Sequence, residues 1–119
     1  MDVVNIQSKL AQIAGYWQPH LVAELNGQHV KLAKLMGEFI WHRHDDEDEL
    51  FLVIKGRLRI ELRSGVVDIG EGEFGIVPRG VEHRPVAEQE VHVLLFEPAG
   101  TRNTGNVRNE RTLETLKRL

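Results

Sequence analysis

Two histidines and a glutamate stand close together near the middle of the chain, at His42, His44 and Glu49. Side chains two residues apart on an extended strand project from the same face, so the imidazoles of His42 and His44 can converge on one point. Glu49 opens the next apolar run and meets the histidines if the two runs pair across the acidic turn at 45–48. Two imidazoles and a carboxylate form a nitrogen and oxygen site that suits a transition metal.

Two stretches of the chain place histidine, glutamate, glycine and proline at distinctive spacings, and together they lie within about residues 37–96. The first stretch has the pattern His42-x-His44-x4-Glu49-x6-Gly56. The second has the pattern Gly72-x5-Pro78-x-Gly80-x2-His83. These two stretches resemble the two sequence motifs of the cupin family. The chain departs from the family at two places. Four residues instead of the usual five separate Gly37 from His42, and Ala87 stands where the second motif usually ends in asparagine.

The resemblance to small single-domain cupins, the type-2 or mannose-6-phosphate isomerase-like group, implies an all-β fold. The expected architecture is a double-stranded β-helix, or jelly-roll barrel. The resemblance also implies a divalent metal held inside the barrel by His42, His44, Glu49 and His83. Three imidazoles and one carboxylate suit Fe, Mn, Ni, Co, Cu or Zn, and this ligand set does not select among those metals.

Similar cupins include dioxygenases and isomerases. One expected function is therefore a metal-dependent enzyme, oxygenase-like or isomerase-like, that acts on a small organic molecule at the metal. The alternative is a metal-binding cupin that binds or senses a small ligand without turning it over. Metal-loaded protein that turns over O₂ or a substrate would distinguish the enzyme from the binding protein.

The apolar run after Glu49 is predicted to line the pocket beside the metal. If Glu49 faces the metal, the alternation of a strand sends Phe51 and Val53 the same way. The intervening side chains then face outward and must be covered by the N-terminal segment, the other sheet or a second subunit; these are Leu50, Leu52 and Ile54. This two-sided apolar strand predicts a homodimer.

Three further residues are candidates for the pocket wall. Glu38 shares a face with His42 if that strand is regular, although a surface position is the alternative. Arg79 lies in a Pro-Arg-Gly corner from which it could hold a carboxylate or phosphate. His92 has apolar neighbours, so a hydrogen-bonded core or pocket histidine is favoured over a fifth ligand.

Short strands must position these residues. We divide the chain into an N-terminal helix and link at 1–20, the barrel at 21–99, and a C-terminal loop with a possible helix at 100–119. The first helix is predicted over Asn5–Tyr16, and the last over Thr112–Leu119. The predicted strands are Leu21–Leu25, Val30–Met36, Glu38–Arg43, Leu50–Ile54, Arg57–Arg63, Val66–Ile69, Phe74–Val77, Val81–Val86 and Val91–Phe96. Asn26-Gly27 predicts a tight hairpin turn, and Pro85 predicts an edge or a bulge.

Composition limits the remaining possibilities. The chain has 119 residues, 41% of them hydrophobic, which suits one domain with one core. The net charge of −3 gives no electrostatic reason to expect nucleic acid. The absence of cysteine excludes thiolate ligands and disulfides, and no apolar run approaches the ~18 residues of a membrane helix. We therefore expect a cytoplasmic protein with a small-molecule ligand.

Overall fold

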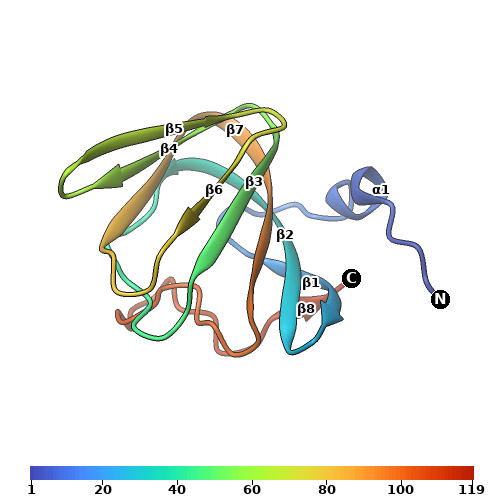
Figure 1. The fold of residues 1–119 in the computed structure, drawn as a ribbon. Coiled ribbons are helices and arrows are strands. Elements are labelled where there is room, and N and C mark those ends of the chain that lie inside the picture. Colours follow the sequence, from blue (N-terminus) through green and yellow to red (C-terminus); the bar gives the residue numbers. More distant parts are fainter.

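Antiparallel strands form most of the molecule in the computed structural model, which describes residues 1–119. One short helix precedes the strands (Figure 1). In chain order the elements are α1 (Ile6–Leu10), β1 (His20–Leu25), β2 (Gln28–Glu38), β3 (Glu49–Lys55), β4 (Arg57–Leu62), β5 (Gly65–Gly70), β6 (Phe74–Val77), β7 (His83–Pro98) and β8 (Lys117–Arg118). The predicted all-β jelly roll is confirmed.

Strand β7 organises the barrel, because it pairs with three other strands. Its first four residues pair with β4, its length from Val86 onward pairs with β2, and its second half also pairs with β3. The sequence predicted two strands here, and that prediction is wrong. The polar residues 88–90 form a bulge opposite β2 and leave the strand continuous. Pro85 lies inside this strand, opposite Ile60 of β4, and not at a sheet edge. The pairing with β2 ends one residue away, at Val86 and Glu38.

The loop that carries two of the histidines is not the strand predicted over Glu38–Arg43. Strand β2 ends at Glu38, and residues 39–48 are mostly irregular. Only His42 makes a ladder pair, through reciprocal backbone hydrogen bonds of 3.0 and 2.8 Å with His83. The two histidines therefore share one side of an irregular loop.

The interior of the barrel is a single apolar cluster. Phe51 and Val53 enter it from β3, and Leu58 and Ile60 enter it from β4, as strand alternation predicts. The hairpin between β1 and β2 turns at Asn26-Gly27 with positive φ at both residues, as the sequence predicts.

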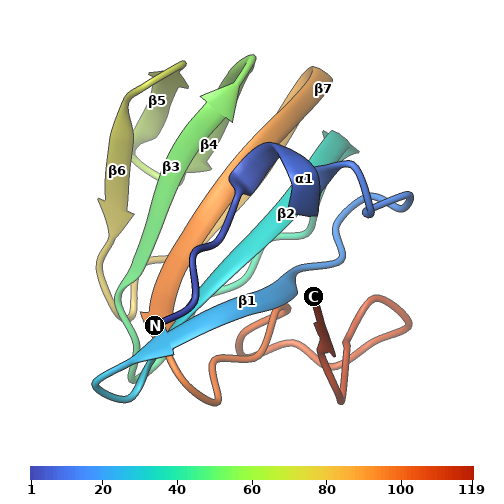
Figure 2. The same cartoon turned by 90° about the vertical axis from the view of Figure 1, so that its right-hand side faces the viewer.

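The N-terminal segment covers an outer face of the sheet. Helix α1 begins after Asn5, whose side chain accepts a hydrogen bond from the Ser8 backbone N–H at 2.9 Å, and it ends at Leu10 and not near Tyr16. Figure 2 shows α1 lying over the sheet. The apolar side of the segment belongs to a second cluster with β1 and β2, made of Leu10, Ile13, Val22 and Leu32. Ile54 of β3 packs at the edge of this cluster, so part of the outward face of β3 is covered from within the chain.

The C-terminal residues do not form the predicted helix over Thr112–Leu119. They run through turns to β8, which pairs in parallel with the start of β1. Leu119 donates its backbone N–H to the Leu21 carbonyl at 2.9 Å. Eight residues are too few for a helix that is stable without packing, so pairing with the sheet edge prevails. The one helix, α1, is not long and apolar enough to cross a membrane.

Candidate metal centre

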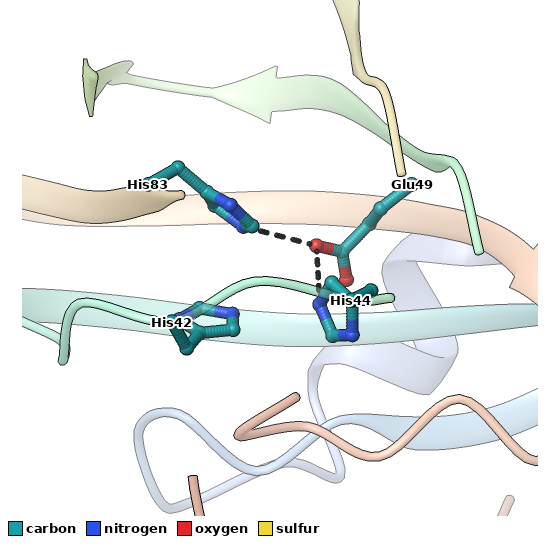
Figure 3. Close-up of side chains that lie close together, drawn as sticks. All are labelled: His42, His44, Glu49 and His83. Carbon is teal, nitrogen blue, oxygen red and sulfur yellow. Dashed lines mark ion pairs between the residues drawn. The ribbon is translucent and has the colours of Figure 1, made fainter. Parts of the chain in front are cut away.

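Four side chains from three separate segments converge inside the barrel (Figure 3). His42 and His44 come from the loop after β2, Glu49 is the first residue of β3, and His83 is the first residue of β7. One nitrogen or oxygen from each of the four lies within 4.8 Å of the others, and all four residues are buried. The structure thus brings together the four residues that the sequence singled out.

Backbone carbonyls orient two of the imidazoles. The Nδ1 of His42 lies 2.9 Å from the Ile40 carbonyl, and the Nδ1 of His83 lies 2.9 Å from the Val81 carbonyl. A carbonyl oxygen can only accept, so each Nδ1 carries the hydrogen and each Nε2 keeps a free lone pair. This second contact fixes the tautomer and ring orientation that metal-binding histidines commonly have.

The atoms at the centre of the cluster lack hydrogen-bond partners. His44 Nε2 lies 3.2 Å from Glu49 Oε1, and His83 Nε2 lies 3.6 Å from the same oxygen (Figure 3). None of these three atoms makes a hydrogen bond of acceptable geometry. Buried polar atoms without partners are costly, and a cation between them would satisfy all three. The donor set therefore fits a divalent transition metal.

The electrostatics favour the protonation states that bind a metal. Burial, followed by the nearby charge of His83, lowers the pKa of His42 to about 4. Burial alone would raise the pKa of Glu49, but the close side chains of His44 and His83 outweigh it and hold that pKa well below its usual value. A neutral imidazole and an ionised carboxylate are the forms that coordinate a metal ion.

A small cavity of about 40 Å³ adjoins the cluster. His42 and Glu49 form part of its wall. Trp17 stacks on Phe39 with ring centroids 4.9 Å apart, and both rings line the cavity. The remaining lining residues are mainly apolar: Pro19, Ala33, Leu35, Phe51, Pro85, Val93, Leu95, Glu97 and Asn103.

Of the residues that the sequence predicted for the pocket wall, only some line the cavity in the structure. Phe51 lines the cavity, whereas Val53 is fully buried in the apolar core beside it. Glu38 and Arg79 are exposed, and each forms an ion pair at the surface, Glu38 with Arg84 and Arg79 with Asp48. The irregular loop after β2 breaks the alternation that would have placed Glu38 on the face of His42. His92 lies half-buried against the Glu90 carboxylate, 2.8 Å away, and does not line the cavity.

Sequence reasoning missed a buried ion pair beside the cluster. Lys31 Nζ donates to Glu97 Oε1 at 2.7 Å, and both side chains are 2% exposed. Glu97 lines the cavity, and burial together with the negative charge of Glu49 raises its pKa well above the usual value. A signal was present, because Glu97 continues the inward alternation of Val93 and Leu95.

Comparison with known proteins identifies similar chains. A family model described as a cupin domain matches residues 27–97. YdbB of Bacillus subtilis (strain 168), an uncharacterized protein, is 36% identical over 64 residues, which span 53% of this chain and 57% of YdbB. The crystal structure of a cupin-2 domain containing protein from Shewanella frigidimarina NCIMB 400 is 40% identical. It superposes with a TM-score of 0.79 over 81% of this chain and 94% of that one.

A more distant structure shares the fold alone. Hydroquinone 1,2-dioxygenase from Sphingomonas sp. TTNP3, solved with 4-hydroxybenzoate bound, is 18% identical with a TM-score of 0.67. The match covers 81% of this chain and 73% of that one.

Proposed function

Because this chain belongs to the cupin family, we propose that it binds one divalent transition-metal ion at the four converging residues and acts on a small organic molecule in the adjoining cavity. The proposed ligands are His42, His44, Glu49 and His83. The supporting observation is that His42 and Glu49 belong both to this cluster and to the cavity wall. A molecule in the cavity would therefore lie directly beside the metal.

A metal at this position would supply Lewis-acid or redox chemistry. The residues of the chain bind and orient the ligand and exclude water from it, through the apolar wall and the Trp17–Phe39 stack. The dioxygenase of the same fold makes oxygen chemistry the first activity to test. An isomerase-like reaction is the second, and Glu97 is the nearest additional carboxyl group for moving a proton.

The size of the cavity favours a second candidate function, a metal-binding cupin that binds or senses a small ligand without turnover. A cavity of about 150 Å³ can hold benzene, whereas this cavity has about 40 Å³. An aromatic ring would need a wider cavity, and the stacked side chains of Trp17 and Phe39 are part of the wall that would have to move.

Oxygen uptake and substrate loss by metal-loaded protein distinguish the two functions. We expect protein reconstituted with Fe²⁺, Mn²⁺, Ni²⁺, Co²⁺, Cu²⁺ or Zn²⁺ to turn over at least one member of a panel of small phenols, diketones and hydroxy ketones. His44→Ala should abolish turnover. His29→Ala, a half-buried histidine outside the cluster, should keep it. Ligand binding without turnover for every metal would instead support the binding protein.

We also propose that the chain forms a homodimer in the cytoplasm. Four of the exposed large apolar side chains of the barrel lie on β5 and β6, at Val66, Val67, Phe74 and Ile76. Phe74 is 62% exposed, and β5 and β6 each pair with a single neighbour, so this surface supports pairing with a second copy. Sedimentation equilibrium should give a dimer that Phe74→Lys converts to a monomer, and a monomeric wild type would refute the proposal.

A further inference from the structure

The chain continues past the end of the family match at residue 97 and turns back across the loop that carries His42 and His44 (Figure 1). We propose that this C-terminal strap, residues 101–113, supports the metal centre by holding the loop that carries two of its ligands. Gly105 and Asn106 act in it as positioning residues, because they hold the histidine loop in the geometry that binds the metal. This inference rests on the proposed metal site.

Asn106 holds the residue that lies between the two histidine ligands. The Arg43 backbone N–H donates to Asn106 Oδ1 at 2.8 Å, and the Asn106 backbone N–H donates to the Arg43 carbonyl at 2.9 Å. One residue of the strap thus satisfies both backbone polar groups of Arg43. Because the loop has no ladder partner at Arg43, these two bonds replace the pairing that a strand would provide.

The neighbouring ligands are held by other parts of the barrel. The backbone of His42 is held by its bridge with His83, and the His44 carbonyl accepts a hydrogen bond from the Gly80 backbone at 2.7 Å. Three consecutive residues are therefore held by two segments, residues 80–83 on either side and the strap in the middle. The strap supplies the middle contact, so its removal would free the link between the two ligands.

Gly105 lies so close to the histidine loop that no other residue fits. Its φ is +57°, and an added Cβ would lie 2.2 Å from the Arg43 carbonyl oxygen and 3.0 Å from His42 Cδ2. The first of these neighbours is a backbone atom, which cannot rotate away. Restoring ordinary contact at 3.4 Å requires a shift of about 1 Å, whereas metal–ligand distances tolerate only about 0.2 Å.

Hydrogen bonds within the strap hold its residues together, so it can act as a rigid clamp. The Thr104 side chain is fully buried, and its hydroxyl bonds to the Val107 carbonyl at 2.6 Å and to the Thr112 hydroxyl at 2.7 Å. The Asn103 amide bonds to the backbone of Arg111 at 2.8 Å and to that of Leu113 at 2.9 Å. A preformed clamp loses little conformational entropy when it holds its target.

Two residues of the strap also reach the cavity and its rim. Arg111 donates to the Glu38 carbonyl at 2.9 Å, and its guanidinium lies 5.4 Å from the ring centroid of Phe39, which lines the cavity. Asn103 lines the cavity itself. The strap therefore contacts the histidine loop at its first residue and at its centre, and it adds an amide to the proposed ligand pocket.

Metal titration of two matched glycine variants tests the proposal. Gly100→Ala is the control, because Gly100 also has positive φ, +88°, but an added Cβ there meets nothing within 4 Å. Both variants carry the backbone strain of a left-handed alanine, and only Gly105→Ala pushes on His42 and Arg43. We expect calorimetric titration of chelator-treated protein with Zn²⁺ to show that Gly105→Ala weakens affinity about 10-fold or more. Gly100→Ala should stay close to the wild type.

A second variant and a second readout keep the test decisive if Gly105→Ala does not fold. Asn106→Ala removes the side-chain bond to Arg43 without adding bulk, and it should weaken Zn²⁺ binding in the same direction. The visible absorption of the Co²⁺-loaded protein reports ligand geometry, so it should change in Gly105→Ala and Asn106→Ala but not in Gly100→Ala. A strap that merely covers the barrel would lower stability without altering that spectrum.

The possible failures are distinguishable. If both strap variants bind Zn²⁺ as tightly as the wild type and give the same Co²⁺ spectrum, the strap is only a cover and the inference is wrong. If the wild type itself binds neither ion, the proposed metal site fails, and the role of the strap fails with it.

Discussion

Lowering the pH from 7 to 5 should destabilise the metal-free protein by about 2 kcal/mol through His42 alone. The side chain of His42 is 2% exposed, and burial followed by the nearby charge of His83 lowers its pKa from 6.5 to about 4. In the unfolded chain the same imidazole regains its ordinary pKa. The difference between the two states makes the free energy of unfolding depend on pH.

The sign follows from which state binds the proton. Between pH 6.5 and pH 4 the unfolded chain takes up a proton at His42 that the folded protein refuses, so stability falls as the pH falls through this window. With these two pKa values, linkage gives a loss of about 2.0 kcal/mol at pH 5 and about 0.2 kcal/mol at pH 7. The difference in stability between pH 7 and pH 5 is therefore about 1.8 kcal/mol. At pH values well below 4 the total loss through His42 approaches about 3.4 kcal/mol.

Urea unfolding followed by the fluorescence of Trp17 and Trp41, in the presence of chelator, measures this effect. The control is His42→Asn, because asparagine does not titrate and all other groups are common to both proteins. The wild type should lose about 1.8 kcal/mol more than the variant between pH 7 and pH 5. Equal losses in the two proteins would refute the reasoning and show that His42 titrates normally in the folded state.

Three further predictions concern the pair beside the site, the core and the metal. Lys31→Met should cost about 3 kcal/mol in urea unfolding, because Glu97 loses its buried partner. Lys31→Met with Glu97→Gln should recover part of that cost, and strictly additive losses would show that the pair is not coupled. Leu58→Ala in the core should cost about 2–5 kcal/mol and leave calorimetric Zn²⁺ affinity unchanged, so weaker binding would contradict the separation of core and site. Zn²⁺ at 100 times its dissociation constant should add about 2.7 kcal/mol of stability, reversed by chelator, and an unchanged melting temperature would count against the site.

The sequence predicted most of the barrel and the composition of the cluster, because both depend on short-range patterns. Alternation in β3 identified Phe51 and Val53 as inward residues. The spacing of the histidines and of Glu49 identified three members of the cluster, although the loop that carries the histidines is not a strand. The side chains still converge because the bridge between His42 and His83 positions that loop as a strand would.

Features that depend on contacts between distant residues could not be read from local patterns. The Lys31–Glu97 pair joins β2 and β7, 66 positions apart, so although alternation points Glu97 inward, nothing local identifies Lys31 as its partner. The strap is polar and rich in glycine and asparagine, which is typical of a loop. Its role depends on the fit of Gly105 against Arg43. The terminal leucines at 113, 116 and 119 have helical spacing, but pairing with β1 prevails in the structure.

Metal content tests the central claim most directly. We would measure it by elemental analysis of untagged protein purified without chelator, beside the His42→Ala/His83→Ala variant. The proposed site predicts close to one equivalent of a divalent transition metal in the wild type and its loss in the variant. The absence of metal from the wild type even after reloading, or equal metal in both proteins, would contradict the claim that these buried side chains form a metal centre.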